Sequence, residues 1–572
     1  MKRPTIVLAA FLLAGCARAT PPAELPPGPA VTVIANGLIV DGSGTEPFLG
    51  DVVIRGDRIE QVTRGPSAFA GHAGARVVDA TGHAVAPGFI NMLSWADESL
   101  LIDPRSQSDI RQGVTLEVFG EGWSMGPWSD AMRERATESG ELEYEIAWTT
   151  LGEYLRHLEQ RGVATNVASF VGATTVRIHV LGYDDVDPTP EQLDSMRALV
   201  RQAMREGAMG VGSSLIYAPA AYAETDELVA LAQEAANQGG IYISHMRSEG
   251  DRIMEAIDEL IAIARRARIP AEIYHLKLAG EANWGRLDEV LDRIDAARAE
   301  GLEITANMYT YTAGATGLDA AMPPWVQAGG REAWIARLRD PATRARVLDE
   351  MRSDSADWES LLRLAGSPER VLLVGFREDS LRYLTGKSLA EIASLYGLPA
   401  EETAIELVVR NDGDVGTVYF LMSEDNVRRQ IALPWMTFGS DAASIAPEGV
   451  FLESNPHPRA YGNFARLLGR YVRDEGVIPL TEAVRRLTSL PAERLDVRER
   501  GRLAAGYHAD VVVFDPATIR DHATFDRPHQ YSTGVRHVFV NGVQVLSEGE
   551  HTGALPGRFV RGPGYRPEGE RP

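Results

Sequence analysis

Cysteine is almost absent from this 572-residue sequence, which has Cys16 as its single cysteine. One cysteine cannot form an intrachain disulfide, and its place near the N-terminus leaves the mature fold without a thiolate for a metal. Positive charge is also scarce, with 57 Lys and Arg residues against 80 Asp and Glu residues and a net charge of −23. This balance disfavours nucleic acid and anionic membranes as partners. No G-x-G-x-x-G motif follows an expected strand, so nothing supports a dinucleotide-binding domain.

The first residues have the pattern of a bacterial export signal. Lys2 and Arg3 precede an apolar run over residues 6–13, which is too short to span a bilayer. The run leads into Leu-Ala-Gly-Cys, ending at Cys16, which resembles a lipoprotein box. The resemblance implies cleavage before Cys16 and lipid attachment to it. We therefore expect residues 1–30 to be signal and tether, and the protein to be periplasmic and lipid-anchored, most simply at the outer membrane. The alternative is an ordinary signal with an incidental cysteine.

Residues 241–280 contain two short apolar runs that end in His245 and His275. Between them, residues 253–268 carry apolar side chains at helical spacing. The order strand, helix, strand favours neighbouring parallel strands joined by a right-handed crossover. Both imidazoles would then lie at the same mouth of the sheet, where they could hold a metal. The alternative is two unrelated histidines in strands.

The middle of the chain alternates apolar strands with amphipathic helices. About eight such units predict an α/β fold with a (β/α)8 barrel over residues 86–499; an open doubly wound sheet is the alternative. A mostly helical insertion at about 323–429 is expected to cover the barrel mouth. The predicted strands are 86–93, 114–119, 166–171, 210–216, 241–245, 272–278, 303–310 and 435–439. The predicted helices include 190–206, 225–238, 286–300 and 480–487.

Both ends of the chain read as short strands with turns. Residues 31–85 and 500–560 alternate polar and apolar side chains, with turn signals at Asn36-Gly37, Gly56-Asp57 and Asn541-Gly542. We expect the two segments to form one small antiparallel β-module, a β-sandwich built from both chain ends.

Barrel enzymes place their chemistry at the carboxyl ends of the strands. His245 and His275 would supply two ligands of an open zinc site, and Glu121, after the second strand, is the natural third. Asp441, after the eighth strand, could be a ligand, a general base, or both in turn. Structural alternatives remain, because Glu121 could be an exposed turn residue and Asp441 a helix cap.

Three further residues are candidates for substrate contact. Lys277 is two residues beyond His275, which would point both side chains to the same face of a strand. Tyr309 is at the end of the predicted strand 303–310, and Arg459 comes after the predicted strand 435–439, although such residues most often serve in packing and at the surface.

Short motifs with a family resemblance occur along nearly all of the mature chain. They are Ile34-Ala35-Asn36-Gly37, Asp41-Gly42-Ser43-Gly44, Ala86-Pro87-Gly88-Phe89-Ile90, Gln112-Gly113-Val114-Thr115, Ser244-His245-Met246-Arg247, His275-Leu276-Lys277, Tyr309-Thr310-Tyr311-Thr312-Ala313-Gly314, Gly439-Ser440-Asp441, His457-Pro458-Arg459-Ala460-Tyr461-Gly462 and Gly506-Tyr507-His508-Ala509-Asp510. Together they resemble the amidohydrolase superfamily and, within it, the N-acyl-D-amino-acid deacylase (D-aminoacylase) group. The resemblance implies a metal-bearing barrel with His245 and His275 as ligands and Asp441 as the catalytic carboxylate. It also implies that Lys277, Tyr309 and Arg459 hold the carboxylate of an N-acyl amino acid.

The sequence departs from the family pattern at the first two strands. The His-x-His pair expected after the first strand is Leu93-Ser94-Trp95, which cannot coordinate a metal. The bridging cysteine after the second strand is replaced by Gly122, with Glu121 beside it. A serine expected after the Tyr-x-Tyr-Thr-Ala-Gly run is Ala315. One metal is therefore expected instead of two.

The sequence thus predicts a metal-dependent amidohydrolase that hydrolyses linear amides of N-acyl amino acids or small dipeptide-like compounds. One zinc per chain is the predicted cofactor, although a site of nitrogen and oxygen ligands accepts other divalent ions. The expected partner is a small amide with a carboxylate. Two alternatives stay open. One is a hydrolase of a cyclic amide or lactone on the same fold. The other is a non-catalytic binding lipoprotein, which the missing His-x-His pair suggests.

Overall fold

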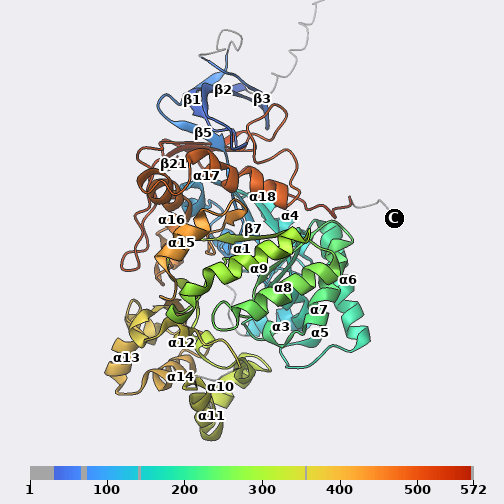
Figure 1. The fold of residues 1–572 in the computed structure, drawn as a ribbon, viewed down its shortest axis with the longest axis vertical. Coiled ribbons are helices and arrows are strands. Elements are labelled where there is room, and N and C mark those ends of the chain that lie inside the picture. Colours follow the sequence, from blue (N-terminus) through green and yellow to red (C-terminus); the bar gives the residue numbers. More distant parts are fainter. Residues whose placement is uncertain (1–30, 66–73, 139–143, 354–356, 568–572) are drawn as a thin grey trace, which may run out of the picture.

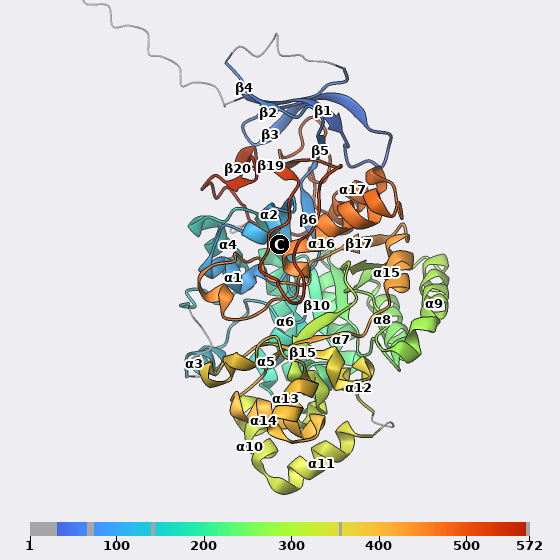
Figure 2. The ribbon, with the colours of Figure 1, turned by 90° about the vertical axis from the view of Figure 1, so that its left-hand side faces the viewer.

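The computed structural model describes residues 31–65, 74–138, 144–353 and 357–567. Three parts follow one another along the long axis of the molecule (Figure 1 and Figure 2): a sheet built from both chain ends, a barrel, and a largely helical insertion at the opposite end. Cys16 and the expected signal and tether lie outside the described residues. Within the described ranges, no helix has both the length and the apolar character needed to cross a membrane.

The middle part is a closed parallel barrel. Six strands form a sheet in the order β17-β13-β12-β11-β10-β9, and three more follow in the order β6-β7-β8. Only Phe170 separates β8 from β9, so these two make one position of the barrel. Their bounds are β6 (Phe89–Asn91), β7 (Val114–Phe119), β8 (Asn166–Ser169), β9 (Val171–Gly172), β10 (Gly210–Ser214), β11 (Ile241–His245), β12 (Ala271–Ile273), β13 (Ile304–Met308) and β17 (Met436–Phe438).

Backbone hydrogen bonds join the first barrel strand to the last. Met92 N donates to Phe438 O at 3.1 Å, and Asp441 N donates to Leu93 O at 2.8 Å. An open doubly wound sheet would leave these two strands as free edges. The predicted (β/α)8 barrel is therefore confirmed, and the open-sheet alternative is wrong.

Helices connect the strands and cover the barrel (Figure 1). In α8 the predicted spacing is seen directly, because Ile253, Ile257 and Ile261 are all buried. The helix α6 begins with a capping box made by Thr189 and Gln192, with proline at its first position. The barrel helices are α1 (Ala96–Ile102), α2 (Gln107–Ile110), α3 (Asp130–Glu138), α4 (Leu151–Arg161), α5 (Ala173–Leu181), α6 (Pro190–Glu206), α7 (Thr225–Ala236), α8 (Ile253–Ala267), α9 (Leu287–Ala299), α16 (Arg459–Arg466), α17 (Leu480–Leu487) and α18 (Ser489–Arg494).

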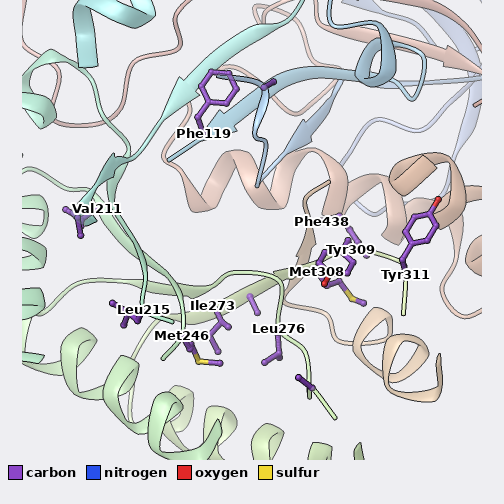
Figure 3. Packing of buried hydrophobic residues seen from close by; sticks show 14 of the residues in the cluster. Phe119, Val211, Leu215, Met246, Ile273, Leu276, Met308, Tyr309, Tyr311 and Phe438 are labelled. Atoms are coloured by element: carbon purple, nitrogen blue, oxygen red, sulfur yellow. The ribbon is translucent and has the colours of Figure 1, made fainter. Parts of the chain in front are cut away.

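Apolar side chains from strands and helices meet in one continuous core. Figure 3 shows part of it, including Leu215, Met246, Ile273 and Leu276, all of which are buried. Burying a side chain of this size contributes about 1.5–3 kcal/mol to folding. This packing fixes the strand ends, and with them the residues that follow each strand.

Strand β12 is shorter than predicted. The expectation of a strand over 272–278 that contains His275 is wrong, because β12 ends at Ile273. His275 has a φ of +34°, outside the strand region. Its backbone N–H donates to the side chain of Asn307 in the neighbouring strand β13 at 2.8 Å, and not to a backbone carbonyl. The chain therefore turns immediately before the predicted metal ligand.

The strands of the two chain ends form one nine-stranded sheet, with β18 of the C-terminal segment antiparallel to β5 of the N-terminal segment. The expectation of a wholly antiparallel module is wrong, because β1 pairs in parallel with β4 and β5. The strands are β1 (Val31–Ile39), β2 (Phe48–Arg55), β3 (Arg58–Val62), β4 (Arg76–Asp79), β5 (Ala84–Pro87), β18 (Val511–Phe514), β19 (Val535–Val540), β20 (Val543–Ser547) and β21 (Glu550–His551).

Two of the three turn signals in this sheet are turns. Gly56-Asp57 connects β2 to β3, and Asn541-Gly542 connects β19 to β20. Asn36-Gly37 instead lies inside β1, where the register with β2 shifts between Ile34 and Gly37. Asn36 has a φ of +61°, a conformation that occurs both in turns and in β-bulges. The Asn-Gly pair that predicted a turn therefore forms a bulge here.

The insertion between β13 and β17 carries helices across the predicted range and also a small sheet that the sequence did not suggest. Its strands are β14 (Gly314–Gly317), β15 (Val371–Gly375) and β16 (Gly416–Tyr419), in the antiparallel order β14-β16-β15. Its helices are α10 (Arg331–Arg339), α11 (Pro341–Met351), α12 (Leu361–Ala365), α13 (Leu389–Tyr396), α14 (Ala400–Arg410) and α15 (Glu424–Ile431).

Candidate metal centre

His245 is the last residue of β11, between β10 and β12 in the parallel sheet. Its register partner in β10 is Ser214. The imidazole is buried, and its Nε2 atom has no hydrogen-bond partner among the described residues. The Nε2 atom lies 3.7 Å from Glu249 Oε2, so the other ring nitrogen, Nδ1, is the one that faces the neighbouring site residues.

His275 lies two residues beyond β12, and its ring meets that of His245. The two ring centroids are 4.6 Å apart with an interplanar angle of 86°. The left-handed backbone of His275 is uncommon for a residue with a side chain and is typical of functional sites. The strand ends therefore bring both imidazoles to one point, as the sequence predicted.

Glu121 completes the cluster from the turn after β7. The flanking glycines Gly120 and Gly122 have φ values of +105° and +74°, and Gly122 N donates to Gly120 O at 2.9 Å. This tight turn directs Glu121 into the barrel mouth, where its Oε1 atom lies 3.0 Å from His245 Nδ1 and 2.7 Å from His275 Nε2. The alternative of an exposed turn residue is wrong, because Glu121 is buried.

Glu121, His245 and His275 fit a divalent metal ion. Their ligand atoms all lie within 4.8 Å of one another. Two imidazole nitrogens and one carboxylate oxygen are the donor set of an open catalytic zinc site. Burial raises the pKa of Glu121, but the two imidazoles lower it to about 2, so the carboxylate is ionised and able to bind a cation.

Glu249, from the loop after β11, is a site residue that the sequence analysis missed. Its Oε1 atom lies 2.9 Å from His275 Nδ1, and it also pairs with the ammonium of Lys277. Burial and Lys277 lower the pKa of His275, yet Glu249 and Glu121 together raise it to about 9. A carboxylate on the far nitrogen of a ligand histidine fixes the ring and makes it a better donor. Its position four residues after His245, in the loop following a barrel strand, was the available signal.

Lys277 and Tyr309 lie next to the histidines. The Lys277 ammonium is 2.7 Å from His275 Nδ1 and 5.7 Å from the centre of the Tyr309 ring. Both residues are buried. Lys277 and His275 thus meet as expected, although a loop carries them and not a strand.

Asp441 follows β17 on the opposite side of the centre. It has a φ of +52°, and its Oδ2 atom lies 2.7 Å from Nη1 of Arg459. Arg459 is buried over the Tyr309 ring, 4.4 Å from its centroid, and its Nε atom has no hydrogen-bond partner in the described chain. Burial raises the pKa of Asp441 although Arg459 lowers it, which suits a group that gains and loses protons. The helix-cap alternative is wrong, because the carboxylate contacts side chains of the site.

A cavity of about 670 Å³ connects all of these groups. Barrel residues form one wall, and the insertion contributes Leu361, Val374 and Thr417 to another. The volume is of the size that small-molecule sites have. The seven predicted metal, catalytic and substrate residues all line this one cavity; they are Glu121, His245, His275, Lys277, Tyr309, Asp441 and Arg459.

Comparison with known proteins agrees with this arrangement. The model of the amidohydrolase family matches residues 76–546. D-aminoacylase of Alcaligenes xylosoxydans xylosoxydans is 34% identical over 533 residues, which cover 92% of this chain and 97% of that protein. A D-aminoacylase structure that addresses the functional role of a binuclear metal centre superposes with a TM-score of 0.77 at 32% identity, covering 94% of this chain and all of that one.

An N-acyl-D-glutamate deacylase from Bordetella bronchiseptica, solved with zinc and a phosphonate inhibitor, also superposes. Its TM-score is 0.77 at 29% identity, over 94% of this chain and all of that one. The family match covers most of the sequence, and the D-aminoacylase match is above 30% identity over nearly the full length. This chain therefore belongs to the amidohydrolase family and is similar to the D-aminoacylases within it.

Proposed function

We propose that this protein is a zinc-dependent enzyme that hydrolyses the amide bond of N-acyl amino acids or small dipeptide-like amides. One zinc per chain would be held by Glu121, His245 and His275. The observation that supports this most directly is the convergence of these ligand atoms in the cavity that also contains Asp441 and Arg459. The named activities of the similar proteins support the same bond and substrate class.

The zinc, when bound, supplies Lewis acidity toward the amide carbonyl and toward water. Asp441 takes the proton from the attacking water and passes it to the leaving nitrogen, so the same carboxyl acts first as base and then as acid. Its raised pKa favours both roles, because a proton held too weakly could not be returned. Arg459 and Trp95 hold this carboxyl, each through a different oxygen atom.

The substrate carboxylate binds at Arg459. Its buried guanidinium keeps an Nε donor without a partner and faces the cavity, which suits a carboxylate. The guanidinium lies over the face of the Tyr309 ring and makes a cation–π contact with it. Lys277 is paired with Glu249, so it adds positive charge to this end of the cavity without having to contact the substrate directly.

The charge of the cavity favours neutral or basic substrate side chains over acidic ones. Lys277 and Arg459 are its only Lys or Arg side chains within the described ranges, and each is paired with a carboxylate. Asp319 and Asp414 also line the wall that the insertion provides. Burial raises the pKa of both, and Asp319 raises that of Asp414 further, so their repulsion is the smaller part of the effect. The larger part is that an acidic side chain would find no unpaired Lys or Arg among the described lining residues.

We also propose that Cys16 anchors the protein by lipid in the bacterial periplasm. The support is the sequence of the export signal alone. Metabolic labelling with a radioactive fatty acid tests it, and wild-type protein should carry the label while the Cys16→Ser variant should not. Equal labelling of both would contradict the anchor.

A substrate panel tests the proposed activity. Zinc-loaded protein should release amino acid from N-acetyl-D-leucine or N-acetyl-D-methionine, and at least about tenfold more slowly from N-acetyl-D-aspartate, a difference of about 1.4 kcal/mol. The L-isomers, dipeptides, a cyclic amide and a lactone belong in the same panel. Turnover of only the cyclic compounds would contradict the linear-amide proposal. Binding of N-acyl amino acids without any turnover would favour the non-catalytic binding lipoprotein.

A further inference from the structure

The end of the first barrel strand carries a tryptophan that contacts both functional carboxylates. Trp95 Nε1 lies 3.1 Å from Glu121 Oε2 and 3.1 Å from Asp441 Oδ1. Its backbone N–H donates to Ala442 O at 3.0 Å, where the first and last strands meet. The half-buried indole is therefore fixed at the barrel closure and points into the cavity.

An indole can donate one hydrogen bond but cannot coordinate a metal. It stands in the Leu93-Ser94-Trp95 segment, where the family resemblance leads one to expect a His-x-His pair. In the D-aminoacylase structure named above, the centre is binuclear, with activation by one metal and attenuation by the second. The imidazoles and Arg459 each contact one oxygen of these carboxylates, and the remaining oxygens, Glu121 Oε2 and Asp441 Oδ1, both face the indole N–H.

We propose that Trp95 occupies the place of a second metal ion, so that this centre holds one metal only, and that Trp95 is a positioning residue for Asp441. The indole N–H links Glu121, a ligand of the proposed zinc, to the carboxyl proposed to move the proton. Arg459 holds the other Asp441 oxygen, so both oxygens are oriented. This inference rests on the proposed function, because it takes Glu121, His245 and His275 as the zinc ligands.

Zinc stoichiometry tests the proposal without depending on turnover. The purified protein is dialysed against excess zinc, unbound metal is removed, and zinc per chain is measured. Wild type should hold one zinc, as should Trp95→Phe, which keeps an aromatic ring but has no ligand atom. Trp95→His, and the double variant Leu93→His with Trp95→His, restore imidazoles, and the double variant should hold two.

Two further readouts separate positioning from simple packing. Zinc added to metal-free wild type should change the tryptophan emission, and this change should disappear in Trp95→Phe. It should persist in the control variant Trp123→Phe, because Trp123 lines the same cavity but is not the indole that contacts Glu121 and Asp441. In Trp95→Phe, kcat should fall about tenfold or more at unchanged zinc content, because one hydrogen bond to a charged group is lost.

Several results would overturn the proposal. Two zinc ions in wild type would do so, as would one zinc in a folded double-histidine variant, or a full emission change in Trp95→Phe. A wild-type protein that binds no zinc would overturn the proposed metal site and this inference together. One zinc in wild type and two in the double variant, with no hydrolysis of any N-acyl amino acid, would remove the proposed substrate and leave the role of Trp95 intact.

Discussion

At the mouth of the barrel, the strands end in two different kinds of residue. At the fifth and sixth strands, His245 and His275 turn nitrogen atoms toward Glu121. At the first strand, Leu93 is buried among apolar residues and Trp95 offers only an N–H donor. The same backbone geometry therefore supports a ligand set on one side and a hydrogen-bond donor on the other. The difference shows that the residues at the strand ends, and not the barrel as a whole, set the chemistry of the mouth. The proposal of a single metal follows from this difference.

The largest loss of activity is expected when a proposed ligand at the fifth or sixth strand is removed. His275→Ala or His245→Ala should lose zinc and at least about 10³-fold in kcat/KM, because the metal supplies several kcal/mol of transition-state stabilisation. Zinc analysis and initial rates measure both effects. His522→Ala, at an exposed histidine, is the matched control and should keep zinc and rate. Full activity in either ligand variant would end the metal proposal.

The second change separates the metal from the proton transfer. Asp441→Asn keeps an amide that can still accept from Trp95 but cannot move a proton. We expect kcat to fall about 10²–10⁴-fold with one zinc retained. Zinc content and steady-state kinetics of the same preparation decide the result. Loss of the zinc as well would make Asp441 a ligand, which was one of the roles that the sequence left open.

The third change tests how the sixth-strand imidazole is supported. Glu249→Gln removes the carboxylate charge beside His275 Nδ1 and Lys277. The zinc affinity should weaken about 10–100-fold, as it does when other partners of ligand histidines are replaced. Competition with a chelator measures it, and Glu255→Gln, at an exposed position of α8, should bind zinc like wild type. An unchanged affinity in Glu249→Gln would show that His275 needs no such support.

The smallest effect on activity is expected at Ser94, beside Trp95 after the first strand. Ser94 Oγ donates to the buried Glu117 carboxylate at 2.8 Å, away from the metal ligands. Ser94→Ala should lower the free energy of unfolding by about 1–3 kcal/mol, because a buried acceptor loses its partner. Zinc content and kcat should stay near wild type. Chemical denaturation and zinc analysis give both values, and a lost zinc would contradict the structural role assigned here to this residue.

Much of the centre could be predicted from the chain itself. His245 was placed at a strand end because an apolar β-rich run stops there, and β11 ends at that residue. His275 was expected in a strand and is instead in a turn, since the hydrogen bond from its N–H to Asn307 depends on a neighbouring strand. Glu249 was missed because its one signal, a position four residues after His245 in the loop that follows a barrel strand, is shared by exposed loop residues.

The order of residues along the chain is enough to predict the alternation of strands and helices, the scarcity of thiol ligands, and the residue types at the strand ends. Only the tertiary structure decided that Glu121 is buried between two imidazoles, 124 and 154 residues away along the chain. It likewise decided that Trp95 joins Glu121 to Asp441, which is 346 residues from it. The physical reason is that barrel closure brings distant strand ends together, and periodicity reports only which face a residue takes within its own element.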